Sequence, residues 1–188
     1  MTLNHRLKAR TPHLAAWAFV VCLVASACQP EGITPGDIEG PFTWGGVDNV
    51  THVRHLWFAA QPDEAALEEA KSEGVDVVIN LRDPSEHEWD EKAVVEGLGM
   101  AYYNLPVRGG EPFDRETFER IETLVAKHRD KQVLIHCSSS NRVGGWLATH
   151  LARRHGLSVE ESLAVGRRAG ITKEGIEQAV RGYLAKSP

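Results

Sequence analysis

The chain of 188 residues carries 26 acidic against 21 basic side chains, which gives a formal charge of −5. This balance argues against a nucleic-acid partner, because a phosphate backbone favours clustered Lys and Arg. The length suits one domain with a single hydrophobic core.

The first 27 residues have the pattern of a secretory signal peptide. Arg6, Lys8 and Arg10 precede an apolar run over residues 14–27 that ends in the small residues Ala-Ser-Ala. The run is shorter than the roughly 20 apolar residues that a membrane-spanning helix needs. Cleavage after residue 27 would remove three cations and no acids, and would move the formal charge from −5 to −8.

The next residue, Cys28, predicts a lipid anchor. The order Ala25-Ser26-Ala27-Cys28 resembles the bacterial lipobox, in which the cysteine is acylated and becomes the mature N-terminus. Several acyl chains would hold the protein stably on a membrane. Cleavage of the same bond by an ordinary signal peptidase would instead release a soluble secreted protein. We therefore expect an exported protein, either a periplasmic or cell-surface lipoprotein or a soluble secreted one.

Residues 28–50 are predicted to form the lipidated N-terminus and a flexible tether. Prolines at positions 30, 35 and 41 and several glycines interrupt this stretch, which has no apolar periodicity. We expect little order before residue 50, and a folded domain over residues 51–188.

Within this domain, short apolar strands alternate with helical patterns. Strands are predicted at 54–59, 75–81, 101–107 and 132–136, with helices between them at 63–73, 88–96 and 114–128. Three further helices are predicted at 142–154, 159–168 and 173–186. Strands separated by helices of this length imply crossover connections. The pattern favours an α/β fold, a three-layer sandwich with a central, mostly parallel sheet flanked by helices.

The run H-C-S-S-S-N-R over residues 136–142 carries the strongest functional indication. Cys137 leaves a buried strand and is followed by a polar turn that opens a helix, where free N–H groups and the helix dipole favour negative charge. Arg142 can donate two parallel hydrogen bonds to a phosphate-like group. Once Cys22 is cleaved off and Cys28 is acylated, Cys137 has no partner for a disulfide. These features predict a thiolate nucleophile inside an anion-binding loop.

The same run resembles the signature of protein tyrosine and dual-specificity phosphatases. Three other segments agree with it: F-A-A-Q-P at 58–62, V-I-N-L-R at 78–82 and Y-N-L-P-V at 103–107. Together they are similar, over about residues 50–185, to a bacterial phosphatase-like family with beta-lactamase hydrolase-like and fused dual-specificity phosphatase/NAD kinase-like domains. The resemblance implies a cysteine-phosphatase-like fold. It also implies hydrolysis of phosphomonoesters, protein phosphotyrosine or similar, without a metal or an organic cofactor.

By this resemblance, Cys137 attacks phosphorus and forms a phosphocysteine, while Arg142 and the loop amides hold the phosphate oxygens. The residues whose amides would bind the substrate, a phosphorylated protein or small molecule, are Ser138, Ser139, Ser140, Asn141 and Val143. His136 is expected to orient the end of the strand and the thiolate.

The loop departs from the phosphatase pattern in three ways. Only four residues separate Cys137 from Arg142, where the tyrosine phosphatases have five, and this shorter length is also found in rhodaneses. Ser140 stands where the family usually has glycine, so a positive φ there would be strained. Val143 replaces a hydroxyl residue that assists the departure of the thiolate. Two alternatives therefore stay open: sulfur transfer through a persulfide on Cys137, and a non-catalytic anion-binding or interaction module.

The general acid is not identified by the sequence. Where the dual-specificity enzymes carry an aspartate after the strand 101–107, this chain reads Arg-Gly-Gly. Glu111 and Asp114 are the nearest carboxylates, and Asp83 belongs to a third candidate group with Glu86 and His87. Asp114 is more simply explained as the N-cap of the following helix.

Arg82, at the end of a predicted parallel strand, could either add positive potential for an anionic substrate or pair with a loop carboxylate. The other histidines show no metal-ligand spacing, so no metal site is predicted.

Overall fold

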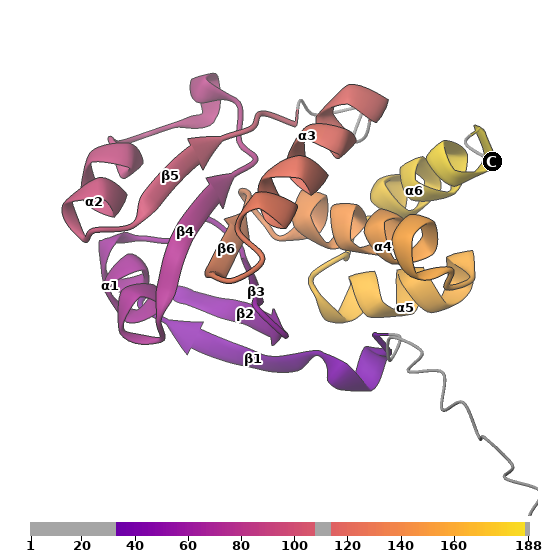
Figure 1. Cartoon of the computed structure of the whole chain (residues 1–188), viewed down its shortest axis with the longest axis horizontal. Coiled ribbons are helices and arrows are strands. Elements are labelled where there is room, and N and C mark those ends of the chain that lie inside the picture. The colour runs from indigo at the N-terminus through magenta and orange to yellow at the C-terminus, as the bar shows by residue number, and fades with distance from the viewer. Residues whose placement is uncertain (1–32, 108–113, 187–188) are drawn as a thin grey trace, which may run out of the picture. The chain divides into compact units, whose positions relative to one another are not determined.

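The computed structural model describes residues 33–107 and 114–186. Six strands form one sheet in the order β1-β2-β3-β6-β4-β5 (Figure 1). The strands β3, β6, β4 and β5 run parallel to one another, whereas β1 and β2 add an antiparallel edge. The bounds are β1 (Glu39–Trp44), β2 (Val47–Val53), β3 (Leu56–Ala59), β4 (Val75–Asn80), β5 (Ala101–Asn104) and β6 (Gln132–His136).

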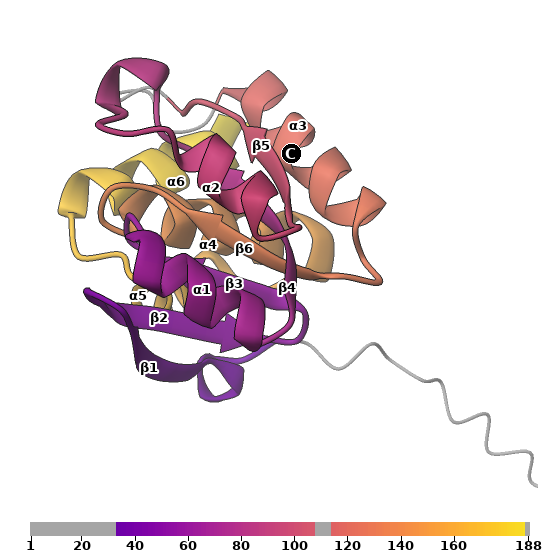
Figure 2. The same cartoon turned by 90° about the vertical axis from the view of Figure 1, so that its left-hand side faces the viewer.

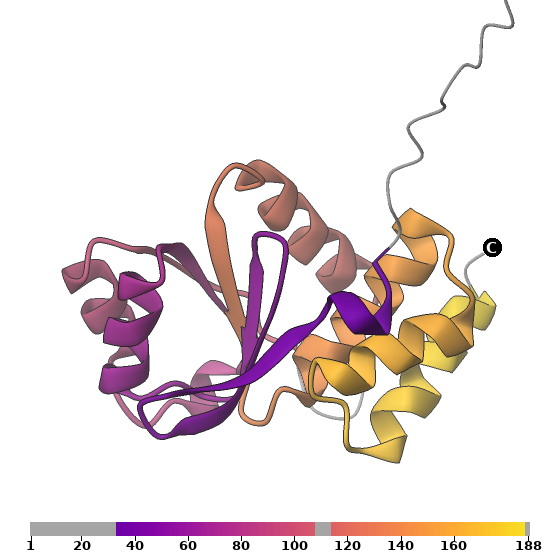
Figure 3. The same ribbon diagram turned by 90° about the horizontal axis from the view of Figure 1, so that it is seen from below.

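Helices cover both faces of this sheet. Helices α1 and α2 lie on one face (Figure 2), and the sheet separates them from α4, α5 and α6 (Figure 3). The three-layer α/β expectation is therefore confirmed. The helices are α1 (Glu64–Ser72), α2 (Glu91–Gly97), α3 (Arg115–Lys127), α4 (Asn141–His155), α5 (Val159–Arg168) and α6 (Glu174–Lys186), and two 3₁₀ turns are η1 (Pro35–Asp37) and η2 (Pro84–Glu86).

The alternating side chains of strand β6 pack into two separate hydrophobic cores, one on each face of the sheet. Val133 and Ile135 pack in the core beneath α3 and α4, whereas Leu134 packs in the core beneath α1 and α2. Because side chains alternate along a strand, His136 continues on the α1 and α2 side and Cys137 joins the opposite core. A nearly continuous apolar strand buried on both faces is typical of parallel sheets.

The expected tether is wrong for residues 33–50. These residues form η1, β1 and most of β2, and several of their apolar side chains, including Ile38, Trp44 and Val50, are buried. Pro41 and the glycines are tolerated because β1 is an edge strand, where a missing N–H breaks no essential ladder bond. The predicted signal peptide over 1–27 and the predicted lipid site at Cys28 lie outside the described residues.

Element boundaries differ little from the expected ones. The helix expected at 88–96 begins at Glu91, because the side chain of Asp90 accepts a hydrogen bond from the Ala93 amide and so acts as its N-cap. Across the two described ranges, no helix is long and apolar enough to cross a membrane.

Candidate active site

Cys137 lies at the carboxyl ends of the parallel strands, the edge at which ligands bind in open α/β sheets. Its predecessor His136 is paired in register with Ala59 of β3 and with Asn80 of β4. The Cys137 amide donates to the Ala59 carbonyl at 3.4 Å, and the residue is 0 % exposed. Two neighbouring strands therefore fix the position of the predicted nucleophile.

Ser140 adopts the left-handed conformation, with φ 59° and ψ −9°. The strain expected from a serine at this position is therefore present, since side chains other than glycine disfavour this region. The Ser140 hydroxyl accepts a hydrogen bond from Asn49 Nδ2 at 3.1 Å, while Asn49 Oδ1 accepts from the Ala60 amide at 3.2 Å. Asn49 thus ties the strained residue to strands β2 and β3 and holds the loop in place.

Gly170 provides the space that Ser140 needs. A Cβ on Gly170, whose φ is +119°, would lie 2.3 Å from Ser140 Cβ. We expect Gly170→Ala to destabilise the protein by about 2–3 kcal/mol through this overpacking and the unfavourable φ. Denaturant unfolding would measure the change. The control is Gly182→Ala in α6, where the added methyl meets no atom and should stabilise by about 0.5–1 kcal/mol. Equal stabilities for the two variants would contradict the proposed packing.

The loop ends in the first turn of α4, where backbone donors are free for an anion. The first α-helical hydrogen bond runs from the Gly144 amide to the Ser140 carbonyl at 2.8 Å, and no side chain of the described residues caps this end. The amides of Asn141, Arg142 and Val143 precede that bond, so they have no partner within the helix. The side chain of Asn141 has a structural role, because its Oδ1 accepts the amides of Thr172 and Lys173, each at 2.9 Å.

Arg142 is held by one edge of its guanidinium. Nη1 and Nη2 donate to the two carboxylate oxygens of Glu86 at 2.8 and 2.7 Å, and Nη1 also reaches the carbonyls of Leu81 and Val107. Nη2 makes a second contact, with Ser138 Oγ at 3.0 Å, inside the loop that follows Cys137. Both N–H groups of Nη2 are thus engaged, so an oxyanion in the loop would bind Nε and replace Ser138 as the second acceptor of Nη2.

The ion pair of Arg142 and Glu86 stays charged at neutral pH. Burial lowers the pKa of Arg142, but hydrogen bonding to Glu86 and the charges of Cys137 and Glu86 raise it above its ordinary value. The pKa of Glu86 is lowered, chiefly by its hydrogen bond from Arg142. Glu86, grouped above with the possible acids, is therefore an ionised anchor for the arginine and a poor proton donor.

The other described acid candidates serve as caps. Asp114 accepts hydrogen bonds from the amide and the hydroxyl of Thr117 at 2.7 and 2.9 Å, which confirms its N-cap role at α3. The bond from the Thr117 amide is the main cause of its lowered pKa. Asp83 accepts from the amide and the hydroxyl of Ser85 at the start of η2. Glu111 lies outside the described residues, so its assignment stays a prediction.

Arg82 is 7 % exposed and lies among protein partners, which favours the ion-pair interpretation. Its Nη1 donates to Gln61 Oε1, its Nη2 donates to the Glu86 carbonyl, and its Nε lies 3.8 Å from Glu86 Oε2. No group of three or more potential metal-binding side chains occurs in residues 33–107 and 114–186.

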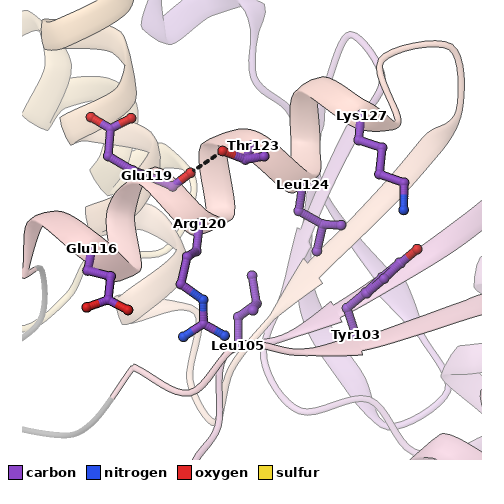
Figure 4. A pocket seen from close by; sticks show the side chains of 8 residues that line it. All are labelled: Tyr103, Leu105, Glu116, Glu119, Arg120, Thr123, Leu124 and Lys127. Atoms are coloured by element: carbon purple, nitrogen blue, oxygen red, sulfur yellow. Dashed lines mark hydrogen bonds between the residues drawn. The ribbon is translucent and has the colours of Figure 1, made fainter.

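A separate groove of about 420 Å³ lies between β5 and α3 (Figure 4). Tyr103, Leu105 and Leu124 supply its apolar surface, and charged side chains of α3, including Arg120 and Lys127, border it. Its residues are distinct from the cysteine loop.

Comparison with solved structures identifies the architecture. Tk-PTP in its active form superposes with a TM-score of 0.61 at 24% identity, over 71% of this chain and 92% of that chain. The kinase associated phosphatase gives a TM-score of 0.61 at 17% identity, over 70% and 86% of the two chains. TpbA from P. aeruginosa, in complex with phosphotyrosine, gives 0.55 at 18% identity, over 86% and 89%.

The chain has the fold of the protein tyrosine and dual-specificity phosphatases. Neither protein-family models nor curated protein sequences match it. In this chain, as predicted from the sequence, Cys137 follows the central parallel strand β6 and Arg142 lies in the first turn of the next helix, α4.

Two residues of the site were missed by the sequence analysis. Gln61 and Glu91 contact each other beneath the loop, although 30 positions separate them in the chain. Gln61 follows a strand in the F-A-A-Q-P segment. This position at a strand end was the only sequence feature that indicated a role in the site. Glu91 resembles an ordinary first-turn helix carboxylate.

Proposed function

We propose that the protein is a cysteine-dependent phosphatase that hydrolyses phosphomonoesters of proteins or small molecules. One observation carries the proposal: Arg142 is anchored end-on by Glu86 and reaches Ser138, in the loop directly after Cys137. An anchored guanidinium beside free helix amides is suited to a phosphate dianion. The phosphotyrosine complex of TpbA, which shares the fold, supports a phosphorylated substrate.

In the first proposed step, the Cys137 thiolate attacks phosphorus. The S–P bond forms as the ester P–O bond breaks, and the leaving oxygen takes a proton from a general acid or departs as a phenolate. In the second step, water attacks the phosphocysteine, the S–P bond breaks, and inorganic phosphate leaves with the thiolate regenerated. Arg142 and the α4 amides stabilise the phosphoryl oxygens in both steps.

Parallel assays of aryl-phosphate hydrolysis and thiosulfate-to-cyanide sulfur transfer would test this function. We expect the purified protein to release phosphate from the aryl ester and to leave thiosulfate unchanged. Sulfur transfer without phosphate release would instead favour the persulfide hypothesis. A folded protein inert in both assays would favour the non-catalytic anion-binding module.

The general acid can be assigned by a pair of substitutions. We propose Glu111 as the acid, since Asp114 and Asp83 are occupied as caps. Glu111→Gln should remove the basic limb of the pH–rate profile, whereas Asp114→Asn, which keeps a good cap, should leave that limb in place. Loss of the limb in the Asp114 variant alone would reverse the assignment.

We propose further that residues 1–27 direct export and that Cys28 carries a lipid anchor. The sequence Ala-Ser-Ala-Cys at 25–28 supports this proposal. Wild-type protein should partition with membranes after expression in a bacterium, whereas Cys28→Ser should not be acylated. Recovery of unmodified wild-type protein in the soluble exported fraction would support the secreted alternative.

A further inference from the structure

A buried carboxylate lies directly behind the cysteine loop. His136 Nε2 lies 2.6 Å from Glu91 Oε1, with the side chains 0 % and 4 % exposed. The other carboxylate oxygen accepts hydrogen bonds from Gln61 Nε2 at 2.7 Å and from Asn80 Nδ2 at 3.2 Å. Although burial opposes ionisation, the hydrogen bonds from His136 and Gln61 leave the pKa of Glu91 below its ordinary value. Glu91 is therefore an anion satisfied by several donors.

Gln61 connects the Glu91 carboxylate to the hydrogen bonds of Arg82 and Glu86. Its amide nitrogen donates to Glu91, and its amide oxygen accepts from Arg82 Nη1 at 2.5 Å. Arg82 also donates to the carbonyl of Glu86, whose carboxylate anchors Arg142. The contacts run from His136, immediately before the cysteine, to Arg142, at the end of the loop.

We propose that Gln61 is a positioning residue that couples the two ends of the cysteine loop, by linking Glu91 to Arg82. This inference rests on the proposed function, because its purpose is to hold Arg142 and Cys137 ready for a phosphoryl group. Gln61 itself makes no hydrogen bond to Cys137 or Arg142 within the described residues.

The amide of Gln61 fits both contacts at once without carrying a charge. It offers a donor to the Glu91 carboxylate and an acceptor to the Arg82 guanidinium. Without that acceptor, Arg82 can turn its charge towards the Glu86 carboxylate, already 3.8 Å from its Nε, and compete with Arg142. The side of the Arg142 guanidinium that contacts Ser138 would then be less well ordered.

Two substitutions separate this role from simple packing. Gln61→Met keeps a similar shape and removes the hydrogen bonds to Glu91 and Arg82, together with the one from Gln61 Nε2 to the Pro62 carbonyl. Gln61→Glu keeps the acceptor for Arg82 but places a carboxylate against Glu91, which repels it when both are ionised. When the introduced carboxyl is protonated, it can again donate to Glu91 and accept from Arg82. The second variant should therefore recover as the pH falls.

The pH dependence must take account of the charged and titratable groups around Gln61 and Glu91. They come from every element packed there: Arg82 and Glu86 after β4, His87 after η2, Asp90 and Glu91 at the start of α2, Tyr102 of β5 and His136 of β6. Burial and the Glu91 charge raise the pKa of Tyr102 to about 12, so this phenol does not titrate in the tested range. The same surrounding groups are present in wild type and in both variants, so the comparison between proteins at each pH reports on the substituted side chain.

Alkylation of Cys137 by iodoacetamide, with and without inorganic phosphate, tests the proposal between pH 5.5 and pH 8.5. Gln61→Met should weaken phosphate protection about tenfold at every pH, the equivalent of about one lost net hydrogen bond. It should also change the rate of alkylation in the absence of phosphate, because the loop around Cys137 would be less well ordered. Gln61→Glu should match it at pH 8 and approach wild type near pH 6, because a neighbouring carboxylate raises the pKa of a carboxyl.

Gln132→Met is the matched control, since Gln132 also accepts a side-chain hydrogen bond, from Trp57, at the opposite end of β6. It should leave phosphate protection unchanged. Wild-type behaviour of Gln61→Met, or a Gln61→Glu defect that does not vary with pH, would overturn the proposal. If wild type shows no phosphate protection, the proposed function fails, and the alkylation rates of wild type and Gln61→Met without phosphate still decide whether Gln61 organises the loop.

Discussion

Replacement of Cys137 by serine is expected to abolish aryl-phosphate hydrolysis while leaving phosphate binding intact. Serine removes the thiolate, and its hydroxyl has no comparable nucleophilicity at neutral pH. The rate should fall by a factor on the order of 10⁴ or more, as when other covalent enzymes lose their nucleophile. The Arg142 fork and the α4 amides are unchanged by this substitution, so inorganic phosphate should bind with an affinity close to that of wild type. Steady-state kinetics and calorimetry measure the two quantities.

Activity that survives Cys137→Ser would contradict the mechanism directly. Loss of both activity and phosphate binding would need a check of folding, because Cys137 is fully buried in the core. If Cys137→Ser unfolds at the same temperature as wild type, it is correctly folded, and the losses then report on the site itself.

Removal of the Glu86 carboxylate should give the second largest effect. In Glu86→Ala, the half-buried guanidinium of Arg142 loses its bidentate partner and keeps only carbonyl and hydroxyl acceptors. We expect kcat/KM to fall about 100-fold, the equivalent of about 2.7 kcal/mol of transition-state stabilisation. Glu86→Gln, which keeps one oxygen acceptor, should lose less.

The matched control is Glu177→Ala, which breaks an equally bidentate but exposed pair with Arg167. Exposed pairs contribute only about 0.2–1 kcal/mol, and this pair lies on α5 and α6, so kcat/KM should not change. Equal losses in the Glu86 and Glu177 variants would show that Glu86 has no special role at the site.

The lowered pKa of Glu86 also predicts how stability depends on pH. A carboxyl whose pKa is lower in the folded state stabilises fully above its unfolded value, about 4.3, and loses that contribution as the pH falls through the folded value. The stability difference between wild type and Glu86→Gln should therefore be constant above about pH 5 and shrink below it. Urea unfolding at several pH values measures this difference. If the stability difference between wild type and Glu86→Gln instead grew as the pH fell, the pKa of Glu86 would not be lowered in the folded state.

The sequence predicted the fold and the reactive loop because both depend on local patterns. Strand β6 is an unbroken apolar run, and the cysteine, the polar turn and Arg142 follow it within six residues. Even the strained conformation of Ser140 followed from the missing glycine. Strands β1 and β2 were not predicted, since Gly40 and Pro41 interrupt the edge strand β1 and the pairing of β2 with β3 is a tertiary effect.

The environment of the loop could not be predicted in the same way. Glu86 and Gln61 reach the site across 56 and 21 positions of the chain, to Arg142 and Arg82 respectively. Their partners depend on sheet order, in which β6 lies between β3 and β4 although it is the last strand in sequence. The spacing of residues along the sequence does not show that β6 is inserted between β3 and β4.

The central claim is that Cys137 accepts the phosphoryl group, and trapping of the intermediate tests it most directly. Val143 supplies no hydroxyl to help the thiolate leave, so phosphocysteine should accumulate during turnover. Rapid acid quenching of the protein with an aryl phosphate, followed by peptide mass mapping, should find one phosphoryl group on the peptide that contains Cys137. Steady release of phosphate with no label on Cys137, or with the label on another side chain, would contradict this account.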